Sequence, residues 1–100
     1  MANDKCDKIY SQVLDANAGG NTTLFDLAQC FISGYDIDKL SNMLKSHDDG
    51  VVLDGLFVCK EIGDLVCKVK ESLLPLERRQ DIDVRTMASE VVAICRLYDC

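Results

Sequence analysis

Hydrophobic residues along this chain recur mainly at every third or fourth position, which is the spacing of one face of an α-helix. Strict alternation over the length of a strand does not occur. Residues 4–18 are predicted to form a first helix that stops at Gly19 and Gly20. A second helix is predicted from a cap at Thr22 or Thr23 to Gly34. The pattern favours an all-α fold of about six helices.

Four more helices follow from the same reasoning. Asp36 is a suitable N-cap for a third helix, which leads through a turn at residues 47–50 into an apolar fourth helix at 51–62. Gly63 is predicted to end that helix and Asp64 to cap the fifth, which should bend or end near Pro75. The sixth helix is predicted to begin near Asp81 or Asp83. Its apolar stripe is Val84, Met87, Ala88, Val91, Cys95 and Tyr98.

An internal repeat emerges when residues 37–62 are shifted forward by 33 positions. The aligned pairs are Leu40 with Leu73, Met43 with Leu76, Val51 with Val84, Gly55 with Ala88, Val58 with Val91, Cys59 with Val92, and Ile62 with Cys95. We interpret residues 36–63 and 64–98 as two stacked antiparallel helical hairpins, preceded by a helix pair at 1–34, within a single helical domain at 1–100. The alternative is that any two amphipathic hairpins of similar length would align this well.

Composition narrows the function classes. A chain of 100 residues with 48% hydrophobic content is long enough for one core. Its net charge of −6 disfavours binding to nucleic acid and to anionic membranes. No apolar run approaches the roughly 20 residues that a membrane span needs. The first ten residues lack the apolar core of a signal peptide, so a cytoplasmic location is expected.

The six cysteines contain no CxxC pair, and the single histidine, His47, lies among polar residues. This pattern favours neither a metal site nor a cofactor site. Four cysteines within the apolar pattern are interpreted as small buried side chains in a reducing cytosol, namely Cys30, Cys59, Cys67 and Cys95. Cys6 and Cys100 lie near the ends of the chain and receive no role.

Residues 36–98 resemble HEAT repeats. The resemblance rests on Pro75 in the first helix of a hairpin, on Asp83-Val84-Arg85 at the start of the second helix, and on Ala88. The earlier hairpin departs from the pattern, because Gly50-Val51-Val52 stands where Asp-Val-Arg would be. Small bacterial HEAT-like proteins include immunity proteins that act beside secreted toxins, among them those of contact-dependent growth inhibition. The resemblance therefore implies a protein-binding module.

No nucleophile with a base and no phosphate-binding loop is recognisable, so we expect a protein without enzymatic activity. The function we expect is neutralisation of a cognate protein toxin, such as a basic nuclease, by occlusion. The entire acidic excess lies in residues 15–64, and the Asp-rich turns of the two hairpins would share one edge. The candidate binding residues are Asp48, Asp49, Asp54, Glu61, Asp81 and Asp83, with Tyr35 or Tyr98 as an exposed aromatic anchor.

Three alternatives stay open. The chain is a structural adaptor or a homo-oligomerising subunit if its apolar fourth helix is incompletely covered. Its expected oligomeric state is a monomer or a weak homodimer. It is a small enzyme if Cys59 or Cys67 acts as a nucleophile. The aspartates serve only solubility and helix capping if no partner binds them.

Overall fold

The structure is a computed structural model that describes residues 2–15 and 21–100. Its elements are α1 (Ala2–Leu14), α2 (Asn21–Ile32), α3 (Asp38–Leu44), α4 (Asp49–Glu61), the 3-10 helix η1 (Gly63–Val69), α5 (Lys70–Leu73), the 3-10 helix η2 (Leu74–Arg78) and α6 (Ile82–Leu97). No residue in the described ranges lies in a strand, so the all-α prediction is confirmed.

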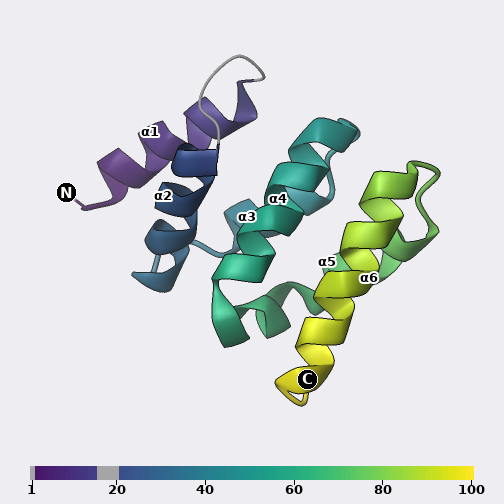
Figure 1. The fold of residues 1–100 in the computed structure, drawn as a ribbon. Coiled ribbons are helices and arrows are strands. Elements are labelled where there is room, and N and C mark those ends of the chain that lie inside the picture. The colour runs from purple at the N-terminus through teal and green to yellow at the C-terminus, as the bar shows by residue number, and fades with distance from the viewer. Residues whose placement is uncertain (1, 16–20) are drawn as a thin grey trace.

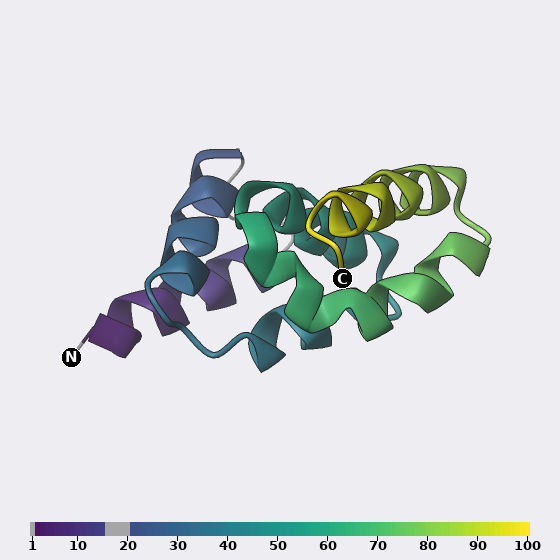
Figure 2. The ribbon, with the colours of Figure 1, turned by 90° about the horizontal axis from the view of Figure 1, so that it is seen from below.

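The helices form two layers (Figures 1 and 2). One layer contains α2, α4 and α6, and the other contains α1, α3 and the segment from η1 to η2. Helix α4 lies in the middle, packed against α2 on one side and α6 on the other, with α3 beneath it. The molecule measures 36 × 29 × 19 Å, and its shortest dimension is about two helix diameters. Each hairpin thus buries its apolar face against its neighbours.

The starts of α4 and α6 repeat the same cap 33 residues apart. The side chain of Asp48 accepts a hydrogen bond from the Gly50 backbone N–H at 2.8 Å, and that of Asp81 accepts one from the Val84 N–H at 3.0 Å. These caps satisfy N–H groups that have no partner within the helix. The fourth helix consequently begins at Asp49, two residues before its predicted start. The sixth begins at Ile82, in agreement with the predicted start near Asp81 or Asp83.

The first two helices differ from the prediction at their ends. Helix α1 ends at Leu14, one residue before a bend at Asp15, and the rest of its predicted continuation, with the glycines that follow, lies outside the described residues. Helix α2 begins at Asn21, so Thr22 and Thr23 lie inside its first turn and not at its cap. Gly34 follows α2 with a φ of 110°, a backbone conformation that glycine adopts without steric cost.

The predicted fifth helix is in fact three short pieces, η1, α5 and η2. Gly63 ends α4 with a φ of 64°, as predicted, but Asp64 makes no cap and lies in the first turn of η1. Pro75 at the start of η2 cannot donate a backbone hydrogen bond and crowds the preceding turn, which prevents a continuous α-helix. The buried residues Val66, Val69, Leu73 and Leu76 still share one face because they are spaced by three or four positions.

The small residue at the centre of α4 allows α3 to approach closely. A Cβ atom at Gly55 would lie 3.2 Å from Leu44 Cδ2 and 3.3 Å from Met43 Cβ, both on or at the end of α3. The aligned Ala88 in α6 is completely buried. The aligned pairs Leu40 and Leu73, and Val58 and Val91, are likewise fully buried. The two hairpins therefore use equivalent positions for the same packing.

The prediction that Cys30 and Cys67 are reduced is wrong, because each forms a disulfide. Cys30 bonds to Cys6 and joins α1 to α2, and Cys67 bonds to Cys100 and joins η1 to the chain end. Hydrophobicity along the chain shows that a cysteine is buried, but it carries no information about a second sulfur brought close by folding. The closed loops span 24 and 33 residues, and in the chain-entropy treatment each crosslink stabilises the fold by roughly 3 to 4 kcal/mol. Cys59 and Cys95 are buried free thiols, as predicted.

We predict that enlarging Ala88 destabilises the protein. Ala88→Leu adds atoms to a fully buried site and should lower the free energy of unfolding by about 1 to 3 kcal/mol in urea titrations. Ala93→Leu, on the exposed face of the same helix, is the matched control and should change it by less than about 0.5 kcal/mol. Equal effects of the two substitutions would contradict the packing described.

Alkylation followed by mass spectrometry should separate the cysteines into two classes. Iodoacetamide is expected to leave the folded, unreduced protein unmodified, because Cys59 and Cys95 are buried. Unfolding without reductant should expose these two thiols, and the other four cysteines should react only after reduction. Labelling of Cys30 or Cys67 before reduction would show that the disulfides do not form.

Candidate functional site

The Asp-rich turns of the two hairpins lie together. The side chain of Arg79, just before α6, forms an ion pair with Asp49 in the first turn of α4, with Nε 2.9 Å from Oδ1. Asp48 and Asp81 cap the two helices at this end, and Asp83 is exposed in the first turn of α6. We define the turn edge as the surface formed by His47, Asp48, Asp49, Arg79, Asp81 and Asp83.

A depression of about 440 Å³ lies along this edge. It is lined by His47, Asp49, Arg78, Arg79, Gln80 and Asp81. The two arginines reduce its negative charge, which the sequence interpretation of a purely acidic edge did not include. Asp49 is already paired with Arg79, whereas Asp83 has no ion-pair partner among the described residues. The edge is therefore a mixed surface on which aspartates predominate.

Asp54 and Glu61 lie on α4 outside the turn edge. Asp54 borders a depression of about 190 Å³ with Val13, Leu14, Asp48, Gly50 and Val51. Its partial burial, and to a lesser degree the neighbouring Asp48 charge, raise the pKa of its carboxyl group above the ordinary 3.8. Glu61 is the last residue of α4, and the helical rise places it about 18 Å from Asp49.

Tyr35 is not an exposed anchor, contrary to the prediction. Only 7% of it is exposed, and its hydroxyl donates a hydrogen bond to Asp7 Oδ1 of α1 at 2.5 Å. Its ring packs against Phe31 and Tyr10, with ring centroids 5.5 and 6.4 Å away. Burial raises its pKa, and the hydrogen bond to Asp7 adds to the shift. Tyr35 therefore serves to hold α1 against the end of α2.

Tyr98 is exposed as predicted, at 47%, but it lies far from the turn edge. It is the C-cap of α6, and about 25 Å of helix separates it from Asp81. A Cβ atom at Gly63 would lie 3.8 Å from its hydroxyl oxygen, so Tyr98 sits close to the end of α4. The eight predicted residues consequently do not form one patch. Four lie on the turn edge, two lie on α4, one is buried and one is at the opposite end of α6.

The prediction missed an aromatic pair on the outer surface. Phe25 of α2 is 46% exposed, and its ring meets that of Phe57 in α4 edge to face, with centroids 5.4 Å apart. Leu53, one turn before Phe57, is also partly exposed. A signal for Phe25 was present, because it lies beside the apolar stripe of its helix and not within it. Its partner Phe57 gave no such signal, because residues 51–62 are apolar on nearly every side of the helix.

The free cysteines have the properties of core residues. Burial raises the pKa of the Cys59 thiol, and a smaller part of the rise comes from neighbouring Cys95. Burial also raises the pKa of Cys95. A thiol is nucleophilic as the thiolate, so both groups are held in their unreactive form. Cys67, the other candidate nucleophile, is held in its disulfide.

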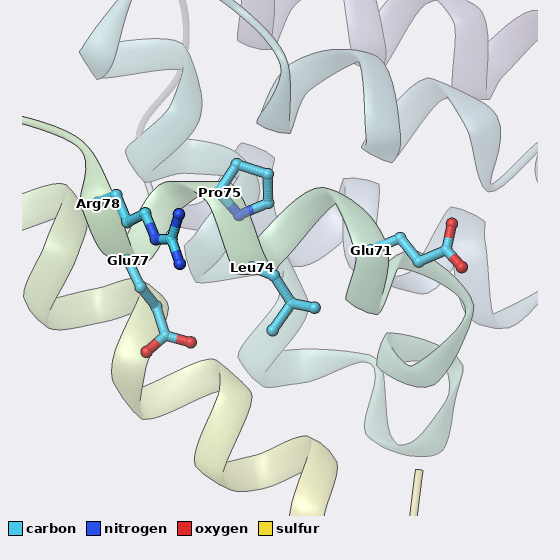
Figure 3. Close-up of a pocket in the computed structure, with 5 residues that line it drawn as sticks. All are labelled: Glu71, Leu74, Pro75, Glu77 and Arg78. Atoms are coloured by element: carbon cyan, nitrogen blue, oxygen red, sulfur yellow. The ribbon is translucent and has the colours of Figure 1, made fainter.

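A depression of about 600 Å³ lies on α5 and η2 and is lined by Glu71, Leu74, Pro75, Glu77 and Arg78. Figure 3 shows these five residues. The carboxylates of Glu71 and Glu77 point away from each other, so they are not placed as an acid–base pair (Figure 3). Among the described residues, no group of three potential ligands is placed to hold a metal ion.

Among the described residues, no helix combines the length and the hydropathy that a membrane span needs. Comparison of the chain with protein-family models, curated proteins and solved structures finds no match. The function of this chain is therefore inferred from its own surface.

We predict that removing the Asp54 charge stabilises the protein at neutral pH. A carboxyl group with a raised pKa favours folding when protonated, and this contribution is lost as the pH rises through the folded-state pKa. Asp54→Asn should therefore raise the urea midpoint at pH 7. The gain should vanish below about pH 3, where Asp54 of the unsubstituted protein is protonated in both the folded and the unfolded state.

Asp26→Asn, in the exposed middle of α2, is the control for this substitution. It should leave the urea midpoint nearly unchanged at both pH values. A lower midpoint for Asp54→Asn at pH 7 would show that the carboxylate is instead stabilised in the folded protein.

Proposed function

We propose that this chain is a non-enzymatic protein-binding module that neutralises a basic protein, such as a toxin, by covering part of its surface. The observation that carries the proposal is the turn edge, where α4 and α6 present aspartates side by side on packed helices. Fixed aspartates attract a basic surface over long distances and increase its rate of association.

The internal repeat supports the same proposal. The starts of α4 and α6 lie 33 residues apart, with an aspartate cap at each start. In the second hairpin Asp83 and Arg85 are exposed while Val84 is buried, which agrees with the pattern that resembles HEAT repeats. Stacked hairpins of this kind offer contiguous binding surfaces without requiring a cavity. We therefore propose the function that the resemblance implies, which is that of an immunity protein.

The cysteines bear on where this binding would take place. A cytoplasmic location was expected, but disulfides form and persist in oxidising compartments, whereas cytosolic thiols are kept reduced. Two of the six cysteines fit a reducing compartment, and the four in disulfides do not. We therefore place the proposed function in an oxidising compartment.

One observation favours a second candidate, a homo-oligomerising or adaptor subunit. Leu53 and Phe57 of α4 are only partly covered, and Phe25 of α2 extends the apolar area. A second copy would bury this area. Sedimentation that shows a monomer at micromolar concentration would remove this candidate.

The binding proposal is tested with the product of the neighbouring reading frame. We expect that protein to co-purify with this chain and to lose its toxicity in its presence. The variant Asp49→Lys/Asp83→Lys reverses two charges on the turn edge and should slow association at least about tenfold at low salt. The loss should diminish as salt is added.

The matched control is Asp38→Lys/Asp64→Lys, which makes the same change of net charge in the first turns of α3 and η1. It should slow association less than about threefold, because those positions lie off the turn edge. Equal effects of the two variants would show that net charge alone matters. A neighbouring product that neither binds nor becomes inactive would contradict toxin neutralisation.

A further inference from the structure

An apolar surface spans α2 and α4. It lies on the outer side of the layer formed by α2, α4 and α6, which faces away from the second layer. We call Phe25, Leu53 and Phe57 the aromatic face. The rings of Phe25 and Phe57 meet edge to face across the two helices, and Phe25 remains 46% exposed. Single exposed apolar residues are common, but three in contact or one turn apart on two packed helices form a contiguous patch.

Acidic groups border this patch along α4. Asp54 lies three residues before Phe57, and Glu61 lies four residues after it, so both are on the same side of the helix. Neither has an ion-pair partner among the described residues. The single lysine of α4, Lys60, forms an ion pair with Glu90 of α6, with Nζ 2.5 Å from Oε2. The aromatic face thus has an apolar centre and two unneutralised carboxylates about 10 Å apart along the helix axis.

We propose that the aromatic face is the docking site for a basic amphipathic helix of the partner protein. Such a helix carries Lys or Arg seven residues apart, which spans the same 10 Å as Asp54 and Glu61. An apolar side chain between them would lie over the rings of Phe25 and Phe57. This inference rests on the proposed function and names the chemistry of the partner.

Charge distinguishes this occupant from a second copy of the chain. A symmetric dimer through this face would place identical surfaces opposite each other. Asp54 and Glu61 of one copy would then approach those of the other, and the net charge of −6 on each chain would add to the repulsion. A basic helix relieves both costs. A Lys or Arg of this helix beside Asp54 would also lower the pKa of its carboxyl group, which burial and the Asp48 charge raise.

The test uses a fluorescein-labelled 18-residue helical peptide of leucine and lysine, with a peptide of leucine and glutamate as its charge control. Fluorescence anisotropy should show binding of the first peptide and not of the second. Phe25→Gln removes an exposed ring and should weaken binding at least about tenfold. Glu61→Gln should weaken binding and flatten its salt dependence.

Ile82→Gln is the matched control, because Ile82 is also an exposed apolar residue but lies at the start of α6. It should change the affinity less than twofold. Amide shifts in nuclear magnetic resonance spectra should fall on α2 and α4, and far-ultraviolet circular dichroism should confirm that each variant is folded.

Four results would overturn the proposal. They are an absence of peptide binding, binding that Phe25→Gln leaves unchanged, amide shifts confined to the turn edge, and a dimer that Phe25→Gln dissociates. If the peptide fails while the neighbouring product is still neutralised, only this inference is wrong. If the neutralisation fails while the peptide binds, the docking chemistry stands and the proposed function is wrong.

Discussion

The close packing of α4 is the constraint on which the rest of the structure depends. Helix α4 contacts α2, α3 and α6, and it approaches α3 so closely that even a methyl group at Gly55 would press against Met43 and Leu44. Close approach lets the neighbouring side chains fill the interior without voids. It also fixes which residues remain outside. Only the side of α4 that faces away from α3 is available, and this side carries Phe57 between two carboxylates.

The same local interactions that start the helices also create the turn edge. Asp48 and Asp81, which lie at equivalent positions of two hairpins, accept hydrogen bonds from the backbone N–H groups of Gly50 and Val84. Because α4 and α6 lie side by side, their capped ends and their negative charges share one edge of the molecule. Arg79 bridges this edge to Asp49 and adds positive charge to it. The aspartates that cap these helices are thus the same residues that we propose attract a partner.

The disulfides lie at the two ends of the stack, where a hairpin has a neighbour on one side only. The bond between Cys6 and Cys30 holds α1 to α2, and that between Cys67 and Cys100 holds the chain end to η1. The chain end is secured further by the Cys100 backbone N–H, which donates to the Cys95 carbonyl oxygen at 3.2 Å. Terminal units of a stack bury less surface than central ones, so covalent crosslinks contribute most where packing contributes least.

The sequence by itself determined the helical class, the turn before α4, the start of α6 near Asp81, and the spacing of 33 residues between the two hairpins, because helical periodicity and turn signals depend on residues a few positions apart. It also placed the stop at Gly63. Tertiary structure alone decided that Cys6 meets Cys30, that Tyr35 is buried against Asp7, and that Phe25 meets Phe57. Each of these contacts joins residues 24 or more positions apart, and their proximity follows from how the hairpins pack, which no local pattern encodes.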